Sequence, residues 1–77
     1  MDTILTERER VKKAIAEGLK AACAELRWTA TKLGAEADAS AQAAQSWLDG
    51  DATPSGEIVV LLMRRNMVVR EHLLSAA

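Results

Sequence analysis

Hydrophobic and polar positions recur along most of this chain with the three- and four-residue steps of an amphipathic helix. The first stripe lies in one long segment, 3–26, and consists of Leu5, Val11, Ile15, Leu19, Ala22 and Leu26. Thr6 and Glu9 form a capping-box sequence, so we expect regular helix to begin at Thr6. Gly18 lowers the helix propensity inside this segment, and it marks either a close contact or a bend.

Four shorter helices are expected after the first, at 29–37, 40–48, 55–66 and 67–74. Hydroxyl side chains cap helices by accepting a hydrogen bond from a free backbone N–H, and three of these segments begin with one: Thr29, Ser40 and Ser55.

The breaks between the helices contain residues suited to turns. Asp38 tolerates the left-handed backbone conformation that a sharp turn between helices often needs. Gly50 has the usual position after a helix C-terminus, and Pro54 disfavours helix at the residue before it. Small residues at Gly34 and Ala44 would allow the second and third helices to approach closely.

The inward positions of the helices predict one shared core: Ile15, Leu19, Leu26, Leu33, Ala37, Ala44, Trp47, Leu48, Ile58, Leu61 and Leu62. Val69 and Leu73 should face inward from the last helix, with Leu74 as a further candidate. The run 58–60 alone would suit a strand, but the sequence offers it no partner strand. We therefore expect an all-α fold, with a domain at 15–77 and a helical extension at 1–14 continuous with the first helix.

A motif pattern surrounds the second and third helices: Trp28-Thr29, Leu33-Gly34, Ser40, Trp47-Leu48, Gly50 and Thr53-Pro54-Ser55. It resembles the Cro/lambda-repressor-like (XRE) helix-turn-helix family, most closely the small phage-type regulators of bacteria. Asp38 departs from it, because glycine is usual at that turn, and Ala44 is smaller than the usual valine or isoleucine. The resemblance covers about 15–66. It implies a compact five-helix, lambda-repressor-like domain that regulates transcription as a DNA-binding homodimer.

Within that resemblance, the third helix would enter the major groove of double-stranded DNA. Its outward side chains are the candidates for reading bases: Gln42, Gln45, Ala41 and Ser46. Glutamine can hydrogen-bond adenine with two bonds, and alanine can contact a thymine methyl group. Contacts to the DNA backbone would come from a second set of residues: Ser40, Thr29, Lys32, Arg27, Arg64 and Arg65.

The charge distribution favours a second hypothesis. The net charge is −1, and residues 35–57 contain no Lys or Arg but five acids: Glu36, Asp38, Asp49, Asp51 and Glu57. The basic residues therefore lie outside the helix expected to read DNA. An acidic surface would suit a protein–protein interaction module built on a helix-turn-helix scaffold, such as a phage-type adaptor, an antitoxin-like protein or an antirepressor.

The short chain also predicts self-association. A chain of 77 residues can form only a small hydrophobic core, so its stability is marginal. Cys23 is the only cysteine, so no disulfide can form within one chain. We expect a homodimer, with a hetero-partner as the alternative. The candidate contacts are apolar residues at the start of the first helix: Ile4, Leu5 and Val11. A competing surface near the C-terminus consists of Val68, Val69 and Leu73.

Catalytic chemistry has little support in the sequence. The single histidine, His72, lies where a basic side chain suits a helix end, and one Cys with one His cannot form a tetrahedral metal site. The glycines are scattered and form no phosphate-binding loop. We expect no enzyme activity, cofactor or metal. The lone thiol, the absence of a long apolar run and the charged start of the chain predict a cytoplasmic protein that enters no membrane.

Overall fold

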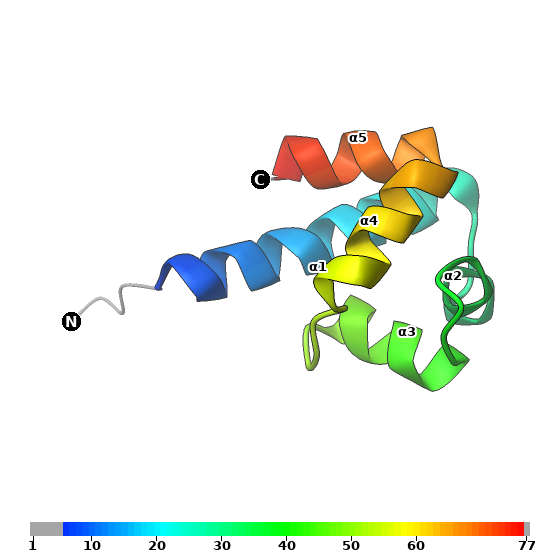
Figure 1. The fold of residues 1–77 in the computed structure, drawn as a ribbon, viewed down its shortest axis with the longest axis horizontal. Helices are drawn as coiled ribbons and strands as arrows, with labels where there is room; N and C mark the ends of the chain where they lie inside the picture. Colours follow the sequence, from blue (N-terminus) through cyan, green and yellow to red (C-terminus); the bar gives the residue numbers. More distant parts are fainter. Residues whose placement is uncertain (1–5, 77) are drawn as a thin grey trace.

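The computed structural model describes residues 6–76, which form five α-helices and, over that range, no β-strand (Figure 1). The helices are α1 (Glu7–Leu26), α2 (Ala30–Glu36), α3 (Ala41–Asp49), α4 (Gly56–Arg65) and α5 (Met67–Ala76). The predicted all-α, five-helix fold is therefore confirmed. The part of the first predicted helix before Thr6 lies outside the described residues.

Each predicted hydroxyl cap begins a helix. The Ser40 hydroxyl accepts the N–H of Ala43 at 3.0 Å, and the Thr29 hydroxyl accepts the N–H of Lys32 at 3.2 Å. Each bond satisfies a backbone donor that the first turn of a helix leaves without a partner. The α5 helix begins in the same way, because the side-chain oxygen of Asn66 accepts the N–H of Val69 at 3.0 Å.

The two predicted turn residues adopt the left-handed conformation. Asp38, between α2 and α3, has φ 56°, and Gly50, after α3, has φ 80°. A third such residue was not predicted: Arg27, with φ 58°, ends α1, and its N–H donates to the carbonyl of Cys23. These residues fix where the chain leaves each helix.

All five helices contribute buried residues to one hydrophobic core. Leu19, Leu33 and Leu62 are fully buried, and Trp47 is 5% exposed. Seven other predicted positions also belong to the core or pack against it: Ile15, Leu26, Ala37, Ala44, Leu48, Ile58 and Val69. Most of the predicted core is therefore confirmed.

Two predicted positions differ. Leu61 is half-buried and lines a surface groove beside Val60 and Arg64, so it does not join the buried core. Leu74 is 58% exposed, because it lies one residue, and so about 100° around the helix, beyond the buried Leu73.

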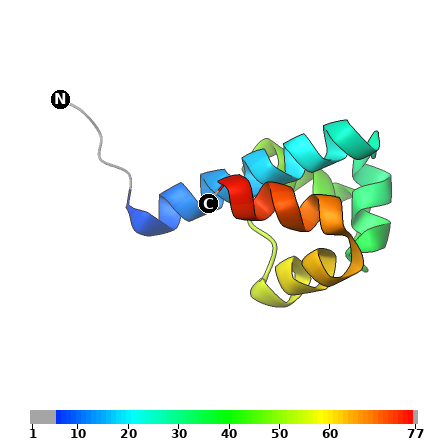
Figure 2. The same cartoon turned by 90° about the horizontal axis from the view of Figure 1, so that it is seen from above.

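Helices α1 and α5 lie side by side and run in opposite directions (Figures 1 and 2). A β-carbon added to Gly18 would lie 2.9 Å from Cδ2 of Leu73 and 3.1 Å from the carbonyl oxygen of His72. Gly18 therefore marks a close contact between these helices. Val69 and Leu73 are buried within this chain, so of the competing dimer surface only Val68, which is half-buried, is accessible.

The first turns of α1 extend beyond the rest of the molecule (Figure 2). Every residue from Thr6 to Lys13 is exposed, including Val11 at 51%. We call residues 6–13 the arm. Of the predicted dimer contacts, Val11 lies in the arm, whereas Ile4 and Leu5 lie outside the described residues. None of the helices from α1 to α5 is long and apolar enough to cross a membrane.

Candidate nucleic-acid interface

Helices α2 and α3 meet in a tightly packed corner. A β-carbon on Gly34 would lie only 2.6 Å from the carbonyl oxygen of Ser40, so nothing larger than glycine fits there without a shift of the backbone. Ala44 and Trp47 are buried on the inner side of α3. The predicted close approach of the two helices is therefore present, and it occurs between α2 and the start of α3.

Arg65, from the end of α4, holds the turn of this corner. Its guanidinium donates to the carbonyl of Glu36 at 2.8 Å and to both carboxylate oxygens of Asp38, at 3.2 and 3.3 Å. The Arg65 and Asp38 side chains are 42% and 66% exposed, so the pair stabilises the fold by no more than about 1 kcal/mol. Its main effect is to fix the position of the turn. A contact between Arg65 and a DNA phosphate would have to replace or share these bonds.

The outer side of α3 carries the four predicted base-reading residues. Ala41, Gln42 and Gln45 are exposed, whereas Ser46 is half-buried and its hydroxyl donates to the carbonyl of Gln42 at 3.2 Å. The side-chain amide of Gln45 donates to Oδ1 of Asp49 at 2.8 Å. The Gln42 side-chain amide forms no hydrogen bond among the described residues. Unlike the Gln45 amide, it can therefore bind a ligand without first breaking a bond.

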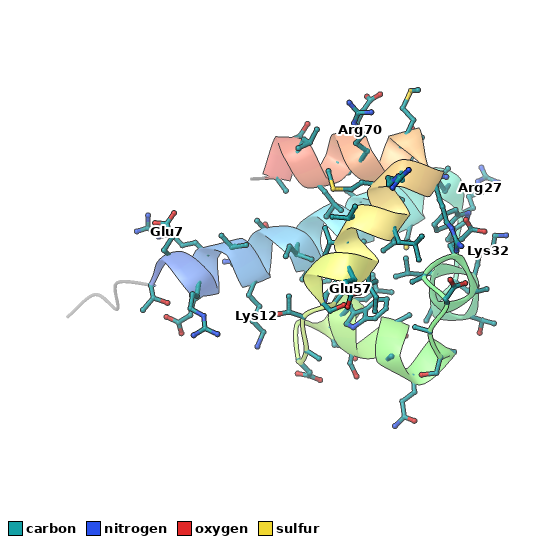
Figure 3. The ribbon with its side chains drawn as sticks, in the orientation of Figure 1. Glu7, Lys12, Arg27, Lys32, Glu57 and Arg70 are labelled. Atoms are coloured by element: carbon teal, nitrogen blue, oxygen red, sulfur yellow. The ribbon has the colours of Figure 1, made fainter. Side chains whose placement is uncertain are left out.

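The predicted backbone contacts divide into two groups. Thr29, Lys32 and Ser40 lie at or near the starts of α2 and α3, and Arg27 lies on the same side of the molecule as Lys32 (Figure 3). Lys32 also forms an ion pair with Glu36 at 3.3 Å. Arg64, by contrast, lines a groove with Val60, Met63 and Arg70 on α4 and α5. The structure thus gathers the first group around the corner and leaves Arg64 on another surface.

The acidic segment is partly neutralised within the fold. Glu36 pairs with Lys32, and Asp38 pairs with Arg65. Asp51 and Glu57 remain exposed. The acidic charge near α3 is thus concentrated toward its C-terminal end and the loop that follows.

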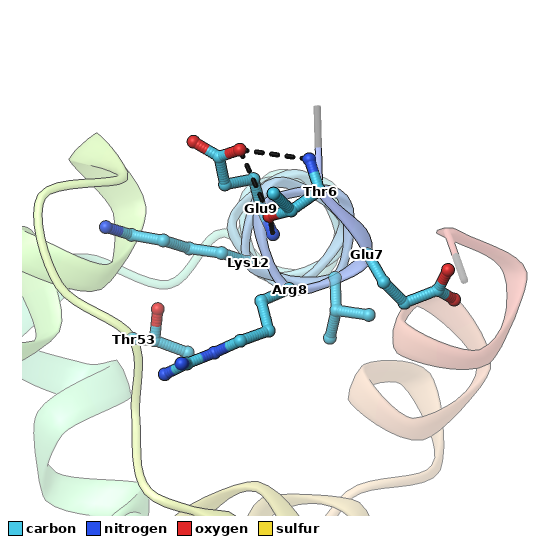
Figure 4. A pocket seen from close by; sticks show the side chains of 7 residues that line it. Thr6, Glu7, Arg8, Glu9, Lys12 and Thr53 are labelled. Carbon is cyan, nitrogen blue, oxygen red and sulfur yellow. Dashed lines mark hydrogen bonds between the residues drawn. The ribbon is translucent and has the colours of Figure 1, made fainter. Parts of the chain in front are cut away.

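Two basic residues near the loop that follows α3 were not predicted as site residues from the sequence. Arg8 and Lys12 belong to the arm and line one cleft of about 590 Å³ with Thr53 of the α3–α4 loop and with the arm's two acids, Glu7 and Glu9 (Figure 4). The sequence feature that could have identified them is the helical spacing 8, 12, 15, 19. This spacing places Arg8 and Lys12 on the same stripe of α1 as Ile15 and Leu19. The apolar residues at this end of the chain predicted self-association, and that prediction left the basic end of the stripe without a role.

The remaining reactive groups have structural roles. Cys23 is buried, and that burial raises the pKa of its thiol, so it stays a neutral, small hydrophobic residue. His72 Nε2 lies 2.7 Å from a carboxylate oxygen of Glu25 and links α5 to α1. Within residues 6–76 no three His, Cys, Asp or Glu side chains are grouped so that they could hold a metal ion.

Comparison with known proteins returned no match: no family model, curated protein or solved structure is significantly similar to the chain.

Proposed function

We propose that this protein is a sequence-specific DNA-binding regulator of the helix-turn-helix class, with α3 in the major groove. The observation that carries the proposal is the presentation of α3. Its inner side is held by buried Ala44 and Trp47, while Ala41, Gln42 and Gln45 face outward at its N-terminal and central turns. A short, rigidly held helix with polar groups on its free side is the usual reading element of such proteins.

Gln42 and Gln45 have different parts in this proposal. They are three residues apart, so both can project toward the same groove. Gln42 is available and reads a base directly. Gln45 must exchange its bond to Asp49 for a bond to a base, which lowers its net contribution.

Backbone contacts in this proposal come from the starts of the two helices. Ser40 and Thr29 can donate their hydroxyl protons to phosphate oxygens, because each uses only its oxygen as an acceptor in capping. Lys32 and Arg27 flank them. The protein acts as a homodimer on a two-fold symmetric site, since one small domain with a low net charge has few phosphate contacts of its own.

The test is a titration of the purified protein against a randomised DNA pool at low salt. We expect a sequence to be enriched. On that sequence, Gln42→Ala should lose the preference at one base position, which is worth about 1–3 kcal/mol, and keep non-specific binding.

Lys32→Ala should weaken binding to all sequences alike and make the salt dependence shallower by about one unit. Lys20→Ala is the matched control, because it removes the same charge from an exposed position on α1. If no sequence is enriched and Gln42→Ala behaves as wild type, the DNA proposal is wrong.

One observation favours the second hypothesis, a protein–protein interaction module. Lys32 and Arg65 already pair with acids, and Asp51 and Glu57 expose negative charge next to α3. Asp51→Asn separates the two functions. It should strengthen DNA binding by reducing repulsion of phosphates, whereas it should weaken a complex with a basic protein surface.

A further inference from the structure

One stripe of α1, formed by residues 8, 12, 15 and 19, changes from apolar to basic toward the N-terminus of the helix. Leu19 on this stripe is fully buried, and Ile15 packs against the core. The next two positions toward the N-terminus, Lys12 and Arg8, are exposed and basic. The stripe therefore becomes cationic where α1 passes beyond the core.

The two cations face the side of the molecule where α3 lies. Figure 4 shows Arg8 and Lys12 extending toward the α3–α4 loop, while Glu7 extends toward α5. Figure 3 shows Lys12 pointing away from α1 on the α3 side. Thr53, in the loop that directly follows α3, lines the same cleft.

The local charge is net positive, although Glu7 and Glu9 line the same cleft as the two cations. The arm holds four basic residues (Arg8, Arg10, Lys12 and Lys13) and two acids (Glu7 and Glu9), so its formal charge is +2. Glu9 is engaged in the helix cap, where its carboxylate accepts the N–H and the hydroxyl of Thr6, each at 3.0 Å. Neither Arg8 nor Lys12 takes part in an ion pair among the described residues.

We propose that Arg8 and Lys12, assisted by the hydroxyl of Thr53, bind the phosphate backbone of DNA beside the groove that α3 enters. The proposal rests on the DNA-binding function proposed above. It supplies the cations that the segment around α3 lacks, since residues 35–57 contain no Lys or Arg. Two cations one helical turn apart can each contact a phosphate oxygen, and such contacts carry no sequence preference.

The chain offers a matched pair of double variants. Arg8→Ala/Lys12→Ala removes one Arg and one Lys from the cleft side of the arm. Arg10→Ala/Lys13→Ala removes the same two residue types from the other side of the same turns. Both have the same net charge, and alanine favours helix at these exposed positions. Any difference between them therefore reports the location of the charges.

The measurement is the affinity for the enriched sequence, and for an unrelated duplex, across a series of salt concentrations. For Arg8→Ala/Lys12→Ala we expect a slope of log K against log salt that is shallower by about two units, because two phosphate contacts are lost. Affinity should fall alike on both duplexes, and base preference should not change. The control pair should lose less than half as much slope.

The outcomes separate this inference from the proposed function. If wild type enriches a sequence but the two double variants have equal slopes, the arm is not a phosphate contact and the proposed function stands. If wild type enriches no sequence and Gln42→Ala behaves as wild type, both proposals are wrong. Arg8→Gln/Lys12→Gln, checked by circular dichroism, repeats the test with polar side chains should the alanine variant fold poorly.

Discussion

The two halves of α1 are stabilised in different ways although they belong to one continuous helix. The half near its C-terminus contributes five buried residues to the fold: Ala16, Gly18, Leu19, Ala22 and Cys23. The arm contributes none. It is held by the reciprocal bonds of Thr6 and Glu9 and by the helix propensity of its side chains.

This difference shows which part of α1 is free to serve a ligand. In the buried half, the side chains that face α5 or the core, such as Leu19 and Cys23, are constrained by packing, so their identity follows from it. In the arm no packing constraint acts, and side chains such as Arg8 and Lys12 can be replaced without loss of the fold. A functional role is therefore easier to test in the arm than at the buried positions of α1.

The largest contrast between the halves should come from truncating one apolar residue in each. Leu19→Ala should lower the free energy of unfolding by about 2–5 kcal/mol, because it leaves a cavity in the core. Val11→Ala should change it by no more than about 0.5 kcal/mol in the monomer, because Val11 is already half-exposed. Urea denaturation followed by circular dichroism measures both.

Comparable losses in the two variants would contradict the assignment of the arm as a region without packing. A loss for Val11→Ala that grows with protein concentration would instead place Val11 in a dimer interface, as its apolar side chain predicts.

The next effect concerns the contact between α1 and α5. Gly18→Ala should gain about 1 kcal/mol in helix propensity. It should lose more by overpacking, about 1–3 kcal/mol, because the added carbon meets the backbone of His72 and Leu73 at 3.1 and 3.2 Å. Side-chain rotation cannot relieve a clash with backbone, so we expect a net loss of stability.

Gly56→Ala is the control for that substitution. It begins α4, and an added β-carbon there meets nothing within 4 Å. It should be neutral or stabilise by up to about 1 kcal/mol. Thermal denaturation of both variants checks the pair, and a stabilising Gly18→Ala would show that α5 can move away from α1.

The smallest effect is confined to the arm. Hydrogen bonds from the N–H and hydroxyl of Thr6 lower the pKa of Glu9 below its ordinary value, since they favour the ionised carboxylate. A pKa that is lower in the folded state stabilises the arm above the ordinary pKa of Glu. That contribution is lost as the pH falls through the lowered pKa.

We therefore expect the arm to lose helix as the pH falls below the ordinary pKa of Glu and through the lowered pKa of Glu9, while the buried half of α1 keeps its structure. The α-carbon chemical shifts of residues 7–13 measure this change. Glu9→Gln should make them insensitive to pH in this range, and an unchanged titration in that variant would assign the transition to another group.

Much of the fold could be predicted because its signals are local. Thr6, Thr29, Ser40 and Ser55 cap the helices that follow them, and each cap depends on residues only three positions away. The left-handed Asp38 could be predicted for the same reason.

Features set by distant residues could not be predicted. The ion pair between Arg65 and Asp38 joins residues that are 27 positions apart in the sequence. No residue near either of them indicates that the pair forms. The stripe that contains Arg8 and Lys12 could be found from its spacing. The sequence could not show whether this stripe faces the α3–α4 loop or α5. The direction that the stripe faces depends on how α3 and α5 pack against α1.

The shortness of α2 and α3 makes the proposed reading surface difficult to separate from the protein. They span seven and nine residues, below the length of about 12–15 residues at which isolated helices begin to be stable in water. A synthetic peptide that copies α3 should therefore be unstructured. A transplanted surface would need α1 beneath it and Arg65 at its turn, so the smallest portable unit is close to the whole five-helix body.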